Sequence, residues 1–390
     1  MTGLSALARS SLCRQAYAAG HRTEEVARRL AEQLEGADSS LLLLFAHHRL
    51  DLGLIADTLA RSSDAQLVGC STTGVISSGR PLAEERGASL EPSATVLALS
   101  RDWAKVGIGV ASELGRNATA NARAATHAAA AALGVRPDLL DPERHVGISL
   151  FDGRGGQEES FCVGSAGAAP QLKFVGGVAW AEPTVPNLVV GTRRLTDAGV
   201  VVLLDSERPF RAVSSVHVEP SALRCVVTAS HGRRILELDG FPAVSRYRRL
   251  LAQLGAPDLP FEALVPGYPL AMYLGGTPYI RSIRAAQGEV LELTSAISSG
   301  QVLRVMSPGD LVGSTMQDLS TVAEALGGIE LLLAFSCISR RRDAAIRNRQ
   351  AELAATYGRY PVAGFDSHGE QYGMVLVNHT LSGLAIGGAG

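Results

Sequence analysis

The sequence lacks paired cysteines, and this excludes two classes of small-site protein. Its 390 residues include five cysteines, an odd number, which are widely spaced and form no CxxC pair: Cys13, Cys70, Cys162, Cys225 and Cys337. Paired cysteines mark disulfide frameworks and structural zinc sites. Their absence argues against both and favours a reducing, cytoplasmic compartment.

An excess of charge of one sign is also missing. The formal net charge is −2, and no basic run with interleaved aromatic residues stands out. The electrostatic basis for binding nucleic acid is therefore absent. The densest basic stretch comprises Arg340, Arg341, Arg342, Arg347 and Arg349. We interpret it either as the solvated face of a helix or as a surface that binds an anion or a partner.

Long apolar runs are missing as well. No stretch approaches the roughly 20 apolar residues that a membrane-spanning helix needs. The first 39 residues contain no apolar core of the kind found in signal peptides. From Thr23, the expected N-cap, they are typical of an amphipathic helix, with Glu24 and Glu25 in its first turn. We expect a soluble protein that makes no membrane contact.

What the sequence does contain is one unit that occurs three times. Each copy has an apolar run, a crossover, and a second run that ends in glycine followed by small or polar residues. The paired runs are 41–45 with 66–74, 145–153 with 172–179, and 330–337 with 360–365. Such runs are typical of strands buried on both faces, and the crossovers suit parallel strands. We predict three β-α-β units, with helices at about 51–61 and 342–357.

The remaining segments have a different pattern. The runs 200–204, 212–218 and 223–228 indicate consecutive strands, and short runs between 272 and 305, separated by Gly-containing turns, indicate an antiparallel meander. The proline-rich stretch 239–269 suggests a domain junction near residue 240. The predicted fold class is α/β, with two halves of mixed, largely β-α-β-built sheets and a meander in the C-terminal half. The divisions are a helical segment, 1–39, and two α/β domains, 40–239 and 240–390.

Polar residues follow the predicted strands. Parallel strands place their C-terminal ends on one edge of a sheet, where open α/β folds bind ligands. We therefore expect these residues to bind a ligand, and we expect none of them to be catalytic. The candidates are Ser71, Thr72, Asp152, Arg154, Gly177, Ser336, Cys337, Arg340, Ser367, His368 and Glu370.

A thiol-dependent enzyme is a competing hypothesis. Cys337 lies at a predicted strand end before a helix, where N–H groups and arginines favour thiolate. His368 ends the next strand of the same unit, and Asp366 or Glu370 could orient it. The simpler interpretation is that Cys337 is a small buried residue and His368 a loop residue.

A metal site, a phosphate-binding loop and a haem site are further hypotheses for these segments. Asp366, His368 and Glu370 alternate as metal ligands on a strand would, with His47 or His48 to complete the set, but Gly369 interrupts the extended run. The loop 151–156 is glycine-rich, yet it lacks both GxGxxG and the P-loop lysine, so a tight turn is the better interpretation. A single histidine, His368 foremost, would suffice as the axial ligand of a non-covalent haem.

Several motifs together resemble the FIST sensory domain. In the N-terminal part they are GCSTTG (69–74), FVGGVA (174–179), TASHG (228–232) and ELDGFPA (237–243). In the C-terminal part they are FSCISR (335–340), GFDSHGE (364–370) and NHT (378–380). The resemblance covers a FIST N half from roughly 40 to 235 and a FIST C half from roughly 240 to 385. Differences lie at Trp180 and the two residues after it, and at Ser339, where the family often has glycine.

The resemblance implies a bacterial sensory protein that binds a small ligand. Amino acids have been proposed as ligands for the family, and members of similar length include haem-binding nitric oxide sensors that regulate a histidine kinase. It also implies that this chain acts on a separate partner, such as a histidine kinase or a cyclic-di-GMP enzyme. The expectation is therefore a sensor, with haem as a possible cofactor.

Overall fold

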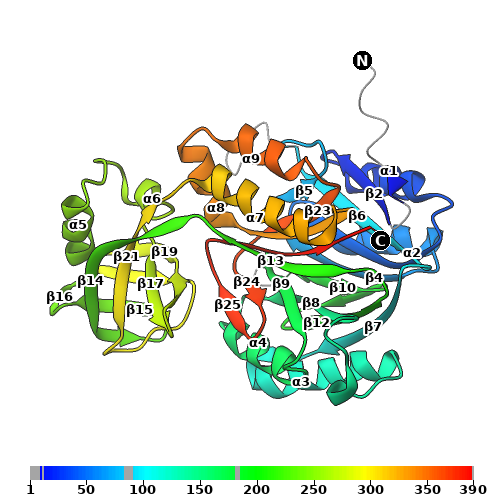
Figure 1. Cartoon of the computed structure of the whole chain (residues 1–390), viewed down its shortest axis with the longest axis horizontal. Helices are drawn as coiled ribbons and strands as arrows, with labels where there is room; N and C mark the ends of the chain where they lie inside the picture. The colour runs from blue at the N-terminus through cyan, green and yellow to red at the C-terminus, as the bar shows by residue number, and fades with distance from the viewer. Residues whose placement is uncertain (1–8, 11–12, 83–90, 181–184, 389–390) are drawn as a thin grey trace.

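A computed structural model describes residues 9–10, 13–82, 91–180 and 185–388. Within them, three β-sheets pack into one body and a fourth sheet forms a lobe beside it, at the left of Figure 1. Strands and helices alternate through most of the body, whereas the lobe is built largely of antiparallel strands. The predicted mixed α/β fold class is thereby confirmed.

The first sheet contains the first repeated unit. Its strands lie in the order β1 (Arg9–Ser10), β2 (Cys13–Ala19), β6 (Ser93–Ser100), β3 (Ser39–His47), β4 (Gln66–Thr72), β10 (Leu188–Val190) and β11 (Arg193–Leu195). Helices α1 (Thr23–Leu34) and α2 (Leu52–Ser62) pack on one face. The N-cap of α1 is Arg22 and not Thr23, which is already the first helical residue. Helix α2 begins where predicted, because the side chain of Asp51 accepts a hydrogen bond from the N–H of Leu54 at 3.0 Å.

The second sheet contains the second unit and two strands from the end of the chain. The order is β25 (Val375–Val377), β24 (Glu370–Tyr372), β9 (Lys173–Ala179), β8 (His145–Asp152), β12 (Gly199–Ser206) and β7 (Ala104–Ala111). Helices α3 (Leu114–Ala132) and α4 (Glu158–Gly167) cover it, and a short 3₁₀ turn follows α3 at Pro137–Leu139.

The third sheet contains the third unit. Its order is β13 (Phe210–Val216), β26 (Thr380–Ile386), β22 (Leu331–Cys337), β23 (Val362–Ser367) and β5 (Val75–Ser77). Helices α7 (Leu311–Leu326), α8 (Ile338–Ile346) and α9 (Gln350–Tyr357) cover it. The single helix predicted at 342–357 is two helices, which meet at Asn348, a residue with a left-handed φ of 56°.

The three predicted β-α-β units are confirmed as three parallel strand pairs: β3 with β4, β8 with β9, and β22 with β23. Each second strand has glycine where it passes closest to the first. A Cβ at Gly69, Gly176 or Gly364 would lie 2.7, 2.1 or 1.8 Å from a carbonyl oxygen of the neighbouring strand, so no side chain fits. The expectation of one common sheet edge is wrong, because each unit belongs to a different sheet.

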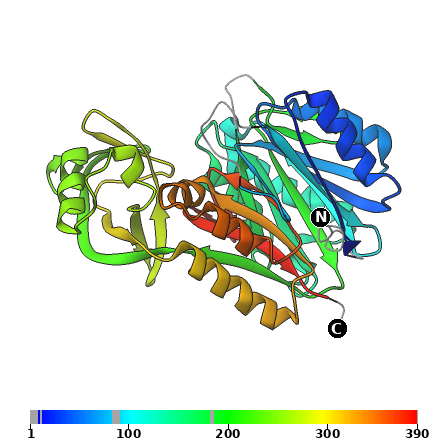
Figure 2. The ribbon, with the colours of Figure 1, turned by 90° about the horizontal axis from the view of Figure 1, so that it is seen from above.

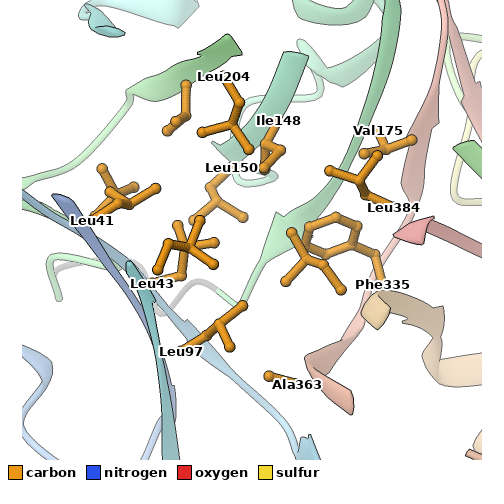
Figure 3. Packing of buried hydrophobic residues seen from close by; sticks show 14 of the residues in the cluster. Leu41, Leu43, Leu97, Ile148, Leu150, Val175, Leu204, Phe335, Ala363 and Leu384 are labelled. Atoms are coloured by element: carbon orange, nitrogen blue, oxygen red, sulfur yellow. The ribbon is translucent and has the colours of Figure 1, made fainter. Parts of the chain in front are cut away.

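The inner faces of the three sheets share one hydrophobic core. Figure 3 shows Leu41 of the first sheet, Ile148 of the second and Phe335 of the third around the same space, and all three side chains are buried. Alternate residues of the same strands face the covering helices instead. Burial on both faces explains why these strands read as continuous apolar runs in the sequence.

The lobe is made by the chain between β13 and α7. Its strands lie in the order β18 (Thr277–Arg281), β17 (Leu270–Leu274), β21 (Val302–Pro308), β14 (Val218–His231), β15 (Arg234–Leu238), β20 (Val290–Leu293) and β19 (Ile283–Gln287), and β16 (Phe241–Pro242) pairs with β15. Helices α5 (Ala243–Gln253) and α6 (Phe261–Leu264) pack against it.

The chain enters the lobe along β14 and leaves it along β21, and Figure 2 shows the lobe standing beside the body. The predicted meander lies in this lobe. The predicted junction near residue 240 falls inside it, at the turn between β15 and β16.

Candidate ligand-binding site

The ends of the three parallel strand pairs meet on one side of the body. At the end of β4, Thr72 donates from Oγ1 to the carbonyl oxygen of Asp366 at 2.9 Å, and the N–H of Asp366 donates to the carbonyl oxygen of Gly74 at 2.9 Å. At the end of β9, the N–H of Val178 donates to the carbonyl oxygen of Gly369 at 2.9 Å. The candidates predicted at separate strand ends are therefore close neighbours.

A row of rings joins the three units at this point. His47 and His48 lie at the end of β3, Trp180 follows β9 and His368 follows β23. Ring centroids lie 4.5 Å apart for His47 and His48, 5.2 Å for His48 and Trp180, and 5.0 Å for Trp180 and His368. Burial, and then the neighbouring positive charges, lower the pKa of His47 to about 4, so this imidazole is neutral at pH 7.

A cavity of about 410 Å³ opens beside His48 and Trp180. This volume lies in the range of small-molecule sites. We call it the ring cavity. Its walls are formed by His48, Arg49, Leu50, Asp51, Leu52, Gly53, Ser71, Trp180, Val185, Pro186, Asn187, Val189 and Arg194. Ser71 is the one predicted candidate among them, and its Oγ donates to the carbonyl oxygen of Trp180 at 2.7 Å.

Asn187, a residue of the ring cavity wall, has a buried hydrogen-bond donor without a partner in the described structure. The residue is 1% exposed, and its Nδ2 meets no acceptor among the described residues. Arg154 donates from Nη2 to Oδ1 of Asn187 at 3.1 Å. Because a guanidinium only donates, the amide atom that it meets must be oxygen, and the NH₂ group is left on the other side. The indole Nε1 of Trp180, also a donor only, is buried without a partner in the described part of the chain.

Asp152 and Arg154 lie behind Asn187 and do not line the ring cavity. The guanidinium of Arg154 meets the carboxylate of Asp152 at 2.6 Å, and that carboxylate also accepts from the N–H of Asp197 at 2.9 Å. The N–H of Arg154 donates to Oδ1 of Asp152 at 2.9 Å, so the glycine-rich loop is a tight turn. The two candidates orient Asn187.

Charged groups stand at the rim of the ring cavity. Arg49 is exposed and has no ion-pair partner among the described residues, whereas Arg194 is paired with Asp57 at 2.7 Å. The carboxylate of Asp51 caps helix α2 and is exposed. The residues around the cavity thus include one guanidinium without an ion-pair partner among the described residues, two buried N–H donors, one carboxylate and several apolar side chains.

A second polar cluster surrounds Glu370 and includes the candidates Ser367 and Gly177. The carboxyl group of Glu370 is fully buried, and it accepts from the hydroxyl of Ser367 and from Oγ1 of Thr380, the latter at 2.6 Å. Burial raises the pKa of Glu370 to about 8, so the carboxyl group is largely protonated at pH 7. Gly177 lies opposite Glu370 in the sheet, and a Cβ there would lie 2.9 Å from the ring of Phe365.

Cys337 belongs to this buried cluster and is no thiolate. Burial raises its pKa to about 12, and the nearby Glu370 acts in the same direction. Hydrogen bonds from Ser339 and from the backbone of His379 act in the opposite direction, but they do not offset the loss of hydration. The expectation that the helix start lowers the pKa of Cys337 is therefore wrong. His368, the proposed base, has its ring against Trp180.

The neighbouring candidate Ser336 is buried on the helix-covered side of the third sheet. Its Oγ lies 3.2 Å from the hydroxyl of Tyr357 in α9. This contact joins β22 to the covering helix. Ser336 does not line the ring cavity.

The arginines at the start of α8 are buried. Arg341 forms an ion pair with Asp366 at 2.8 Å, and both side chains are 2% exposed. Arg340 is fully buried and donates from Nη2 to Oγ1 of Thr315 at 2.5 Å and from Nη1 to the carbonyl oxygen of Ser215 at 3.3 Å. The interpretation of this run as a solvated helix face therefore fails for these two residues.

Comparison with known proteins now identifies the family. The model of the FIST N domain matches residues 40–240, and that of the FIST C domain matches residues 243–373. The first match alone spans more than half of the chain. The chain belongs to the FIST family. FIST domains are sensory domains that bind small ligands in signal transduction.

Curated proteins and solved structures add little to the FIST assignment. No curated protein matches the sequence. A cyanuric acid hydrolase from A. caulinodans is 11% identical, with 97% of this chain and 99% of that chain covered and a TM-score of 0.36. A second cyanuric acid hydrolase structure also has 11% identity and a TM-score of 0.36, with 96% and 99% covered. In the part of the chain that the structure describes, no helix combines the length and apolar character needed to cross a membrane.

The three side chains considered as metal ligands in this FIST protein have separate partners. Asp366 pairs with Arg341, Glu370 bonds to Ser367 and Thr380, and His368 lies on Trp180. Among the described residues, no group of three or more His, Cys, Asp or Glu is arranged to hold a metal ion. A haem needs only one axial histidine and not a cluster of ligands. The histidine in the wall of the ring cavity is His48.

Sequence reasoning missed several residues of the two clusters. Asn187 is an isolated asparagine after a proline, and no spacing rule distinguishes it. Trp180 was visible only as a departure from the family pattern. His217 and His379, whose rings lie 6.2 Å apart beside Arg340, come from segments far apart in the chain. Burial lowers the pKa of both histidines.

Proposed function

We propose that this protein is the ligand-binding component of a signalling system and that the ring cavity takes a small molecule carrying a carboxylate, such as an amino acid. The single observation that supports this proposal is the buried, unused Nδ2 donor of Asn187 at the cavity wall. A buried N–H without an acceptor costs about 1–3 kcal/mol. A ligand oxygen would recover that free energy on binding.

The other groups around the cavity support the same ligand chemistry. Trp180 Nε1 and Arg49 are further donors, and neither can accept a hydrogen bond. The exposed carboxylate of Asp51 at the rim suits the ammonium group of an amino acid. Leu50 and Val189 give the ligand side chain an apolar surface. Like FIST domains in general, the protein then acts through a partner, for which we propose a separate histidine kinase or cyclic-di-GMP enzyme.

The test is a binding screen on the purified chain. The melting temperature is measured with each of the common amino acids and with small mono- and dicarboxylates, because a ligand that binds only the folded state raises it. Isothermal titration then gives the affinity of every hit. We expect a subset of carboxylates to bind, and the corresponding amides to bind at least about tenfold more weakly. If no carboxylate binds, and none is released from the purified protein on denaturation, the proposal is wrong.

A second candidate ligand is haem, and the position of His48 favours it. This imidazole stands at the wall of a cavity that also has leucine, valine and proline side chains and an exposed arginine, a combination that suits a macrocycle with propionates. Haem would supply an iron that binds a diatomic gas such as nitric oxide. The chain itself would provide the axial imidazole and the apolar wall.

Absorption spectra separate the two candidates. Protein from haem-supplied cells is expected to show a Soret band if haem is the ligand, and His48→Ala should abolish it while His368→Ala retains it. The opposite pattern would show that His368, the ligand expected from the sequence, is the axial ligand. The lack of a Soret band, even after addition of hemin, would exclude haem as the ligand and would not contradict the carboxylate proposal.

A further inference from the structure

A larger groove lies between the lobe and the body. Its volume is about 730 Å³. On the lobe side it is bounded by α6 with the residues around it and by β19, and on the body side by α8 and the first residue of α9. The groove and the ring cavity share no lining residue.

The groove has an apolar floor with positively charged edges. Ile346 of α8 is 42% exposed in it, and Val265 and Phe261 of the lobe face it from the other side. Arg342 and Arg284 line it from the body and the lobe, against one acidic residue, Glu262. The side chain of Arg284 is 70% exposed, and its nearest carboxylate oxygen, from Glu292, is 3.7 Å away.

A further arginine lies next to the groove. The guanidinium of Arg248 stands 5.4 Å from the ring centre of Phe261, on the lobe side. Three guanidinium groups around an apolar floor complement a segment with apolar side chains on one face and carboxylates beside them. An amphipathic helix that lays its apolar face into a hydrophobic groove is a common mode of recognition.

Helix α8 connects this groove with Asp366 at the end of β23 and with the base of the lobe. Its first turn is held by the ion pair of Arg341 and Asp366. Its middle meets the passage from β13 into β14, where Asp343 lies 3.3 Å from Nε2 of His217. At its end the chain meets the passage from β21 into α7, because Arg347, bonded to Asp343 at 2.9 Å, donates to the carbonyl oxygen of Gly309 at 2.8 Å.

Both chain crossings between body and lobe are therefore held by the helix that forms one wall of the groove. A shift of the first turn of α8, where Arg341 pairs with Asp366, would change the width of the groove. A surface that is open to a partner, on a helix bonded to the end of β23, suits a protein that transmits a change of shape.

We propose that this groove binds an acidic amphipathic segment of a separate signalling protein. The proposal concerns the output of the sensor, and its test uses no small ligand, so it can fail while the proposed function stands. The occupant is identified by its chemistry alone, namely a helical segment with leucine-like anchors for Ile346 and carboxylates for Arg284 and Arg342.

The test uses a defined probe. A fluorescent synthetic peptide of about four helical turns, with leucines on one face and glutamates on the other, is titrated with the full chain and followed by anisotropy. The same peptide with lysines replacing the glutamates is the matched probe. We expect the glutamate peptide to bind, with an affinity that falls as salt is raised, and the lysine peptide to bind at least about tenfold more weakly.

Variants locate the contact. Arg284→Glu and Ile346→Ser change exposed side chains, so folding should be retained. Each should lower the affinity for the glutamate peptide by about tenfold. Arg116→Glu, on α3, replaces another exposed arginine and should leave binding unchanged. Equal binding of the two peptides, or no effect of Arg284→Glu, would overturn the proposal. The proposal would also be overturned if vesicles of anionic lipid displaced the peptide, or if this chain formed a dimer that Ile346→Ser dissociates.

Discussion

Arg154 donates from Nη2 to Oδ1 of Asn187 at 3.1 Å, and this contact determines which atom of the amide remains for a ligand. The carboxylate of Asp152 accepts from the same Nη2 at 2.6 Å and holds Arg154 in place. The NH₂ group of Asn187, a residue of the ring cavity wall, is thus the end of the amide that has no partner among the described residues. Preorganised donors of this kind lower the cost of binding because no side chain has to be ordered.

The first prediction concerns that amide. Asn187→Asp keeps an oxygen for Arg154 and replaces the unused donor by an oxygen that repels a carboxylate. We expect the affinity for a carboxylate ligand to fall by at least about tenfold, since a hydrogen bond to a charged group contributes about 1.5–3 kcal/mol. Titration calorimetry measures it. Asn348→Asp, in the link between α8 and α9 and remote from the cavity lining, is the control and should bind as the parent does.

The second prediction concerns the buried ion pair of Arg341 and Asp366. Arg341→Met preserves much of the side-chain volume but removes the guanidinium that pairs with the buried carboxylate of Asp366. We expect the free energy of unfolding to fall by about 3–5 kcal/mol in urea. Arg28→Met breaks the exposed pair of Arg28 with Glu32 and should cost no more than about 1 kcal/mol. Similar losses in both variants would mean that the buried pair is not what joins α8 to β23.

The third prediction concerns Glu370, whose pKa burial raises to about 8. Between pH 4.5 and 8 the folded state retains a proton that the unfolded chain releases, so this group makes stability fall as pH rises through that window. The slope approaches roughly 1.4 kcal/mol per pH unit. Glu370→Gln can still bond to Ser367 and Thr380 and should lack this component.

The measurement for Glu370 is the difference in unfolding free energy between parent and Glu370→Gln from about pH 5 to above pH 8. It should grow steadily in favour of the variant and level off above the pKa of about 8. Glu324→Gln, at an exposed position on α7, should give a curve parallel to that of the parent. A difference that stays constant with pH would contradict a buried, protonated carboxyl group.

The fourth prediction concerns thiol chemistry. Burial raises the pKa of Cys337 to about 12, and Cys70, Cys162 and Cys225 are buried as well. In the folded protein near neutral pH only the half-buried Cys13 should react readily with a disulfide reagent. Cys337→Ala should leave the rate and extent of labelling unchanged. Fast labelling that this variant removes would instead support a thiol-dependent activity.

Much of the body could be predicted from the sequence because its strands are buried on both faces. Runs such as 41–45 and 331–335 are wholly apolar, and helix α2 lies where a helix was expected, at about 51–61. Local patterns do not encode which strands pair across long distances. Nothing in the sequence therefore indicated that β24 leaves the third unit to join β9 in the second sheet.

The ligand site was only partly predictable for the same reason. Ser71 and Trp180 are 109 positions apart, and their hydrogen bond depends on how two sheets pack. The strand-end rule found Ser71, which lines the ring cavity, and Asp152, which lies behind its wall, but it missed Asn187, which also lines the cavity and bonds to Arg154. Desolvation, which reverses the expected pKa shift of Cys337, cannot be read from a sequence because it depends on the final burial.

The most direct test of the ring cavity uses the fluorescence of Trp180. The chain has two tryptophans, and Trp103→Phe leaves Trp180 as the sole indole, between His48 and His368. A carboxylate that raises the melting temperature should change the emission of Trp180 saturably, and Asn187→Asp should move the midpoint to at least about tenfold higher concentration. A carboxylate that stabilises the protein without changing this emission, and with equal affinity for the Asn187→Asp variant, would contradict the account by placing the ligand elsewhere.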